Sequence, residues 1–289
     1  ESGDSTGDVS LRALFESPDA ADGDSQLTIE RLAFLTCRGG WPQAVDMREE
    51  IALDQAIDYY DAVIHSDINR ADQVQKNPER VKRLMWSYAR NQGSQVPNTV
   101  IAQDISPNAE SPTDPETVAA YLNALRKIFV VEDMPAWNPN LRSKTAIRST
   151  DTRYFVDPSI AVAALGIGPN DLLNDLNTFG FLFEALCVRD LRIFADALNG
   201  TVYHYRDKNG LECDAVVHLR NGAYGLIEIK LGGDTLIEQG ASSLKELANK
   251  IDTSRMKAPA FLMVLTGTGQ YAYRRPDGVC VVPIGTLKD

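Results

Sequence analysis

The feature that most constrains the fold is a pair of short apolar segments that carry three charged residues. One segment contains Asp214 and the other contains Glu228 and Lys230, with a turn at residues 220–222 between them. Their composition predicts two adjacent antiparallel strands. Strand alternation places Asp214 on the same face as Val216, and Glu228 beside Lys230. The sequence therefore predicts that Asp214, Glu228 and Lys230 come together.

A fourth acidic residue lies upstream on a predicted helix. Glu184 is the only polar residue in the run Phe181–Val188. An unpaired buried charge is costly, so a carboxylate flanked in this way is expected to lie near the core with a partner. The alternative is a partly exposed side chain on the rim of the helix.

Carboxylates and a lysine in this order suit metal-assisted hydrolysis of a phosphodiester bond. Two or three carboxylates hold Mg²⁺, a hard cation that prefers oxygen ligands, and Mn²⁺ is a possible substitute. The metal activates a bound water and offsets charge on the phosphate, while a lysine stabilises the transition state. We predict Asp214, Glu228 and Lys230 as catalytic residues, and Glu184, Asp214 and Glu228 as metal ligands. The alternative for the strand residues is a solvated face.

Around these residues, the apolar pattern predicts an α/β sandwich. A helix is predicted over residues 172–197, followed by strands at 201–206, 212–219 and 224–230, a helix at 242–251, and strands at 260–266 and 279–283. A helix, a three-stranded meander, a second helix and a further strand form such a layered domain.

The first half of the chain is predicted to be mostly helical. Residues 1–26, rich in Ser, Gly and Asp, are expected to be a loop or connector. Helices are predicted over residues 28–35, 49–69, 78–90, 98–104 and 115–128, the last capped by Asp114, and strands at 129–131 and 154–156. Three helices followed by a strand suggest a winged helix-turn-helix.

The predicted class is α+β, with a helical connector region (1–75), a winged-helix-like domain (76–150) and the sandwich domain (151–289). In a DNA-binding winged helix, the third helix enters the major groove. Here that helix begins Pro115-Glu116-Thr117 and offers no cation, which favours packing or protein interaction. A basic loop either contacts phosphate or is solvated. Its basic residues are Arg142, Lys144, Arg148 and Arg153.

Composition excludes several classes of protein. The 289-residue chain has a net charge of −11, which argues against a general nucleic-acid coat protein. The acidity lies in residues 1–171, with 16 Lys/Arg against 26 Asp/Glu, whereas residues 172–289 hold 13 against 14. Neither a membrane span nor a signal peptide is expected. Four scattered cysteines argue against a zinc site or disulfide framework, and Cys187 and Cys213 suit a core, so a reducing cytoplasm is expected.

The order of these motifs resembles the PD-(D/E)XK nuclease superfamily. More narrowly, the chain resembles the C-terminal domain of unknown function of bacterial and archaeal predicted AAA+-type ATPases. The segments that carry the resemblance are Gly39-Gly40-Trp41-Pro42, Tyr59–Asn69, Thr117-Val118-x-x-Tyr121-Leu122, Tyr154-Phe155-x-Asp157, Gly180–Glu184, Tyr205-Arg206-Asp207, Glu212-x-Asp214 and Glu228-x-Lys230.

The resemblance implies an N-terminal ATPase module with a phosphate-binding loop. That loop needs Gly-x-x-x-x-Gly-Lys-Ser/Thr, and the chain contains no Gly-Lys dipeptide. No ATP site is therefore expected here, and the ATPase module is expected upstream of Glu1. The implied function is Mg²⁺-dependent hydrolysis of DNA. The alternatives are a catalytically silent module that binds nucleic acid or protein, and a regulatory lid for the ATPase.

Overall fold

The computed structural model describes residues 2–71, 74–106, 113–139 and 150–289, which divide into two compact units. The sheet unit combines Glu1–Leu32, Met134–Ser149 and Leu186–Asp289, and the helical unit combines Ala33–Asp133 with Thr150–Ala185. Each unit is thus assembled from segments that are distant in the sequence. The three-part division expected from the sequence stays a prediction.

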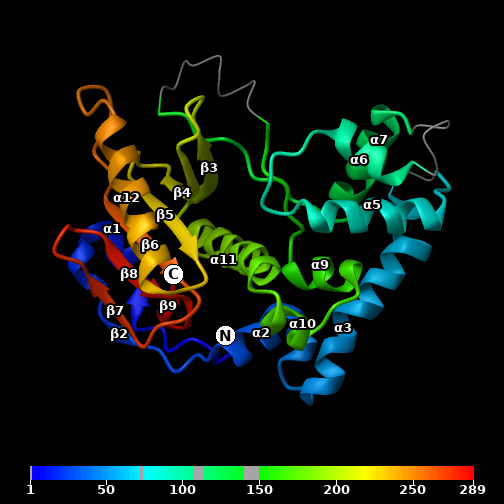
Figure 1. Ribbon diagram of the computed structural model, residues 1–289, viewed down its shortest axis with the longest axis horizontal. Coiled ribbons are helices and arrows are strands. Elements are labelled where there is room, and N and C mark those ends of the chain that lie inside the picture. Colours follow the sequence, from blue (N-terminus) through cyan, green and yellow to red (C-terminus); the bar gives the residue numbers. More distant parts are fainter. Residues whose placement is uncertain (1, 72–73, 107–112, 140–149) are drawn as a thin grey trace. The chain divides into compact units, whose positions relative to one another are not determined.

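The sheet unit contains a seven-stranded mixed sheet in the order β2-β7-β8-β6-β5-β4-β3 (Figure 1). The strands are β2 (Gly23–Asp24), β3 (Gly200–Arg206), β4 (Glu212–Leu219), β5 (Tyr224–Lys230), β6 (Phe261–Thr266), β7 (Tyr271–Arg274) and β8 (Cys280–Pro283). β3, β4 and β5 form an antiparallel meander, whereas β5, β6 and β8 run parallel. The predicted meander and the two later strands are confirmed.

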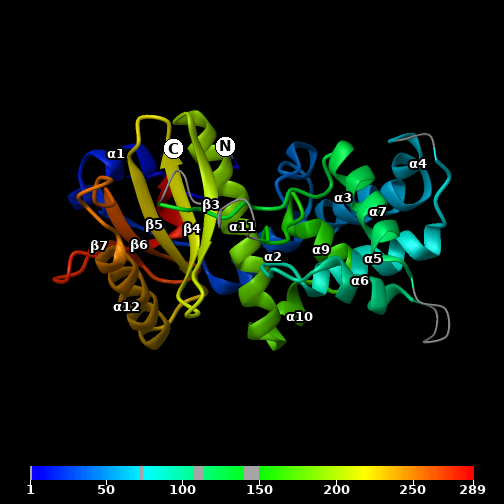
Figure 2. The same ribbon diagram turned by 90° about the horizontal axis from the view of Figure 1, so that it is seen from above.

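Helices lie on both faces of this sheet. α12 (Asp234–Lys250) connects β5 to β6 across one face, and α1 (Leu11–Glu16) lies on the other (Figure 2). Phe15 of α1 packs edge-on against Phe261 of β6, with 5.0 Å between the ring centroids. α12 begins well before the helix predicted at 242–251. The predicted start was too late because Gly240 interrupts the apolar pattern in the middle of the helix.

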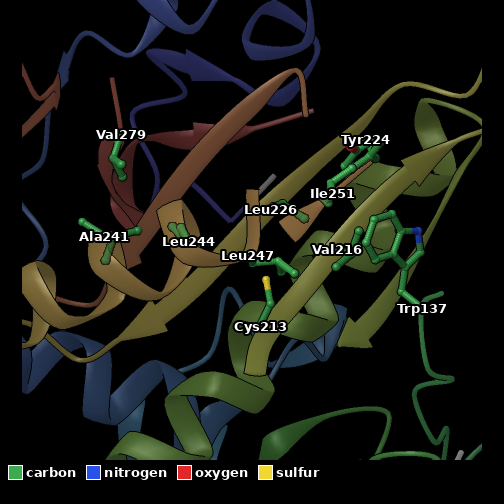
Figure 3. Packing of buried hydrophobic residues seen from close by; sticks show 11 residues of the cluster. Trp137, Cys213, Val216, Tyr224, Leu226, Ala241, Leu244, Leu247, Ile251 and Val279 are labelled. Atoms are coloured by element: carbon green, nitrogen blue, oxygen red, sulfur yellow. The ribbon is translucent and has the colours of Figure 1, made fainter. Parts of the chain in front are cut away.

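The core of the sheet unit lies between α12 and the sheet (Figure 3). α12 contributes apolar residues three or four positions apart, which places them on one helix face. The buried cluster contains Trp137, Cys213, Val216, Tyr224, Leu226, Ala241, Leu244, Leu247, Ile251, Val264 and Val279. The predicted core positions of Cys187 and Cys213 are confirmed, since both are buried.

The first 26 residues are part of the sheet unit, and the expectation of a connector was wrong. β1 (Val9–Ser10) pairs in parallel with β9 (Leu287–Lys288), and β2 pairs with β7. Leu11 and Leu14 of α1 are fully buried. Two-residue strands and a six-residue helix are too short to show a periodic pattern, and their partners lie far along the chain.

The helical unit is formed by short helices, and α5 packs against α6 and α9 while α6 packs against α7. Its elements are α3 (Glu49–Ala62), a π-helical turn (Val63–Asp67), α4 (Ile68–Arg70), α5 (Pro78–Arg90), α6 (Asn98–Ile105), α7 (Pro115–Lys127), α9 (Pro158–Leu165) and α10 (Pro169–Asn174). Two of the four boundaries between the units fall inside α2 (Ile29–Arg38) and α11 (Leu176–Ala197). The predicted cap of α7 is confirmed, because the Asp114 side chain accepts a hydrogen bond from Glu116 N at 2.8 Å.

The strands predicted at 129–131 and 154–156 do not form. These segments meet at one isolated bridge between Val131 and Phe155. Phe129 has a φ of 57°, in the left-handed region, so extended backbone cannot start directly after α7. The helical unit therefore has the three predicted helices. In the part of the chain that is described, the paired strands of a wing do not accompany them.

The long helix predicted over 172–197 is also interrupted. Asp175 separates α10 from α11, and its carboxylate accepts hydrogen bonds from Asn177 N and from the N–H and hydroxyl of Thr178. Aspartate is a preferred N-cap because it satisfies the free N–H groups at the start of a helix. The apolar periodicity continues through this position, which explains why the break was missed.

The predicted α+β class is confirmed: a mostly helical half precedes a mixed sheet. Within the described ranges, no helix combines the length and the apolar character needed to cross a membrane.

Candidate functional site

Asp214, Glu228 and Lys230 form one ionic cluster on β4 and β5, as the sequence predicts. The Nζ atom of Lys230 lies 3.0 Å from Asp214 Oδ2 and 2.7 Å from Glu228 Oε2. The Glu228 side chain is 6% exposed, and the other two are about a fifth exposed. Two carboxylate oxygens therefore converge on one cation at a largely buried position.

A β-bulge in β4 sets the position of Asp214. Tyr203 of β3 lies opposite Val216 and Tyr205 lies opposite Cys213, so two residues of β4 face one residue of β3. Cys213 and Val216 both join the core under α12. The prediction that Asp214 and Val216 lie on the same face of the strand was therefore wrong. The prediction that Asp214 lies near Glu228 and Lys230 was nevertheless correct.

The bulge directs the Asp214 carboxylate toward the backbone of β5. The register between β4 and β5 runs only as far as Ala215 and Ile227. Beyond that pair, Asp214 Oδ2 accepts a hydrogen bond from Ile229 N at 2.7 Å. A side-chain oxygen thus replaces a strand carbonyl, which fixes the carboxylate next to Lys230.

Glu228 is held by the close approach of α12. A Cβ atom on Gly240 would lie 3.2 Å from Glu228 Cβ and 3.3 Å from Val264 Cγ2. Only a glycine lets α12 lie this close to β5 without a shift of the strand. The apolar pattern does not predict this role of Gly240, although a glycine beside Ala241 in an amphipathic helix is a recognisable sign of close packing.

Burial and the nearby charges change the protonation of the cluster. Burial, followed by the Asp214 carboxylate, raises the pKa of Glu228 from 4.5 to about 7, against the opposing effect of Lys230. Burial alone would lower the pKa of Lys230, but Asp214 and Glu228 raise it above its ordinary value. Lys230 is therefore charged at neutral pH, and Glu228 changes charge near neutrality.

This pKa predicts a pH-dependent stability. Between pH 4.5 and about 7, the folded protein keeps the Glu228 proton that the unfolded chain has lost, so stability decreases as the pH rises. We expect the free energy of unfolding, relative to Glu228→Gln, to fall by about 2–3 kcal/mol across this window. Urea unfolding with a chelator at several pH values measures the difference. An unchanged or rising difference would contradict the buried, protonated state.

Glu184 belongs to the helical unit, where the Tyr154 hydroxyl donates a hydrogen bond to its Oε1 atom. The expected partner of this carboxylate is thus a tyrosine, and its role as a metal ligand stays a prediction. Gly93 also lies against it, since a Cβ there would be 3.2 Å from Glu184 Oε1. In the described part of the chain, no group of three or more His, Cys, Asp or Glu side chains is placed to hold a metal ion.

The basic loop is described only in part. Arg142, Lys144 and Arg148 lie outside the described residues. Arg153 is buried, with its guanidinium 3.0 Å from Asp133 Oδ2 and 2.8 Å from Asn98 Oδ1. For Arg153, both expectations were therefore wrong, because it is a structural partner of Asp133 and not a solvated or phosphate-binding side chain.

Two family models match the chain. Residues 29–171 match a domain of unknown function (DUF8612), and residues 179–287 match a second domain of unknown function (DUF4143). Comparison with curated proteins and with solved structures finds no match. The second match includes Asp214, Glu228 and Lys230 but leaves out β1, α1 and β2. Residues 179–287 are thus similar to a domain that is commonly found C-terminal to AAA ATPase domains.

Proposed function

We propose that the sheet unit is a PD-(D/E)XK-type nuclease domain that hydrolyses phosphodiester bonds of DNA with Mg²⁺. The observation that carries this proposal is the convergence of Asp214 and Glu228 on Lys230. The bulge in β4 orients Asp214, and the adjacent antiparallel strand β5 carries Glu228 and Lys230, which together give the donor set that such chemistry needs. Bulges are common next to active sites for this reason.

The two acids fit a magnesium ion. Their oxygens lie 3.0 and 2.7 Å from one positive charge, so they are already oriented toward a common cation. Mg²⁺ is often held by one or two carboxylates, with water and substrate phosphate as the other ligands. When bound, it would supply an activated water and offset phosphate charge. Asp214 and Glu228 would hold it.

The remaining roles belong to the protein itself. The hydrogen bond from Ile229 N keeps Asp214 oriented, and the packing of Gly240 keeps Glu228 at the sheet. Lys230 keeps its proton, so it can donate to a phosphate oxygen and stabilise negative charge there.

Cleavage assays with Mg²⁺ or Mn²⁺ test the proposal. We expect cleavage of single-stranded, duplex or branched DNA, and a loss of about 100-fold or more in Asp214→Ala and in Glu228→Ala. Glu212→Ala is the matched control, since this acid lies on the same strand but is exposed and pairs with Arg206. Cleavage that persists in both site variants would exclude these residues as the active site.

A second candidate function is a catalytically silent binding or regulatory module that follows an ATPase. The pairing of Lys230 with both acids favours it, because an internal ion cluster can be structural. Calorimetric titration with Mn²⁺ separates the two functions. Binding that Asp214→Asn abolishes supports the nuclease, whereas the absence of binding, together with a change in ATP turnover when the chain is added to its ATPase module, supports regulation.

We also propose that the predicted winged-helix region, whose wing strands do not form in the described residues, uses α7 for packing and not for entry into a DNA groove. The first turn of α7 carries Glu116 and no cation, and its basic residues Arg126 and Lys127 lie in the last turn. Insertion of the start of this helix into a DNA groove would therefore bring an acid to the phosphates.

A further inference from the structure

The outward face of α5 is basic and aromatic, in a chain that is acidic overall. α5 contains the cations Arg80, Lys82, Arg83 and Arg90 and the single acid Glu79, a net charge of 4 − 1 = +3, whereas the whole chain carries −11. The surface formed by Lys82, Arg83, Trp86 and Arg90 is called the α5 face below.

Helix geometry brings these side chains into one row. Lys82, Trp86 and Arg90 follow at intervals of four residues, and Arg83 lies next to them. The opposite side of α5 is fully buried. Its buried residues include Val81, Leu84, Met85 and Tyr88. The row is therefore fixed on a packed helix and extends over about 12 Å, from the rise of about 1.5 Å per residue.

Trp86 is an unusual residue to leave in water. It is 44% exposed, although Arg90 stacks over its ring with Cζ 4.8 Å from the centroid. The cation–π contact orients both side chains and leaves much of the indole uncovered. An exposed tryptophan held beside arginines supplies a flat apolar surface for a second ring.

The four cations of α5 are not neutralised within the described residues. Arg80, Lys82, Arg83 and Arg90 form no ion pair with a described carboxylate, in contrast to Arg126 and Arg153 of the same unit, which pair with Asp133. Four such cations on one short helix repel one another, and a polyanion would relieve that repulsion.

We propose that the α5 face binds single-stranded nucleic acid. Lys82, Arg83 and Arg90 contact successive phosphates, and one unpaired base stacks on Trp86. The row of about 12 Å is long enough to contact more than one phosphate of an extended strand. A single strand fits better than a duplex, because the bases of a duplex are stacked on one another and present no free face to an indole. The surface does not depend on the Asp214–Glu228–Lys230 cluster.

Fluorescence anisotropy with a labelled oligothymidine of about 20 nucleotides tests the proposal, with a chelator present so that no cleavage occurs. We expect Trp86→Ala to weaken binding by about 5- to 100-fold and Trp86→Phe to weaken it less, because phenylalanine keeps a stacking surface. We expect the double variant Arg83→Glu/Arg90→Glu to weaken binding at least tenfold and to reduce the salt dependence by about 0.7 for each phosphate that is no longer bound.

The matched control is Arg48→Glu/Lys127→Glu, which makes the same charge change at two exposed positions of the helical unit. It should bind like the original chain. The chelator keeps the proposed nuclease inactive, so the result is separate from that proposal. Thermal unfolding confirms that each variant is folded. Equal weakening in the control, no binding at low salt, preference for duplex, or equal displacement by polyglutamate would each overturn the proposal.

Discussion

A fragment that starts at Leu176 and runs to Asp289 is expected to remain unfolded, although it includes all of the residues 179–287 that match a family model. The fragment lacks α1, whose Leu11 and Leu14 are fully buried, and lacks Trp137, which packs in the core 5.0 Å from the Tyr224 ring. Removal of one large buried side chain costs about 2–5 kcal/mol. Three such removals together cost about 6–15 kcal/mol, which is as large as the 5–15 kcal/mol by which a typical domain is stable.

Circular dichroism and urea unfolding of this fragment measure the effect. We expect no cooperative transition, in contrast to the whole chain. Deletion of residues 1–3 is the control, because these residues precede the ion pair between Asp4 and Arg31 and should be dispensable. A fragment that unfolds cooperatively with native-like helix content would show that the N-terminal segment and Trp137 are accessory to the sheet unit.

Replacement of Lys230 by methionine is expected to destabilise the protein by about 3–5 kcal/mol in the absence of divalent cations, because it leaves two carboxylates largely buried without a counter-ion. The effect should be largest near pH 8, where Glu228 of the original chain is ionised and paired with Lys230, and smaller near pH 5, where Glu228 is protonated because its pKa is about 7. Mn²⁺ should restore much of the stability, since a ligand that binds only the folded state stabilises it.

Lys245→Met is the matched control for this experiment. Lys245 also pairs with an aspartate, Asp277 at 2.7 Å, but its side chain is 38% exposed. An exposed ion pair contributes about 0–1 kcal/mol, so this variant should remain close to the original stability, with or without Mn²⁺. If the two lysine variants behave alike, the Asp214–Glu228–Lys230 cluster is solvated and does not act as the proposed metal site.

Much of the local structure follows from the sequence. The observed bounds of α5 match the predicted helix, and α7 differs by one residue at its end. In both helices a proline occupies the first position after an Asn or Asp cap, and the apolar spacing is regular. Local signals of this kind do not depend on distant residues, which is why they predict bounds well.

The elements that the sequence does not predict depend on distant partners. β1 is a strand because Val9 lies beside Leu287, and no feature near Val9 reveals that pairing. The same holds for the candidate site. Alternation and the spacing of 14 residues were enough to predict that Asp214 meets Glu228 and Lys230, but not the bulge that aims Asp214 or the approach of Gly240. The partner of Glu184 also depends on tertiary structure. In the folded chain, the Tyr154 hydroxyl donates a hydrogen bond to this carboxylate.

The pairing of β1 with β9 has a consequence for biosynthesis. Val9 emerges from the ribosome long before Leu287, so the N-terminal strand has no partner while nearly the whole chain is translated. The helical unit, which ends at Ala185, can fold in this interval, because its helices form from local contacts. Until β9 is made, the buried side chains of α1 are exposed. A nascent chain in this state is expected to bind chaperones, and stalled translation before residue 287 would leave an aggregation-prone intermediate.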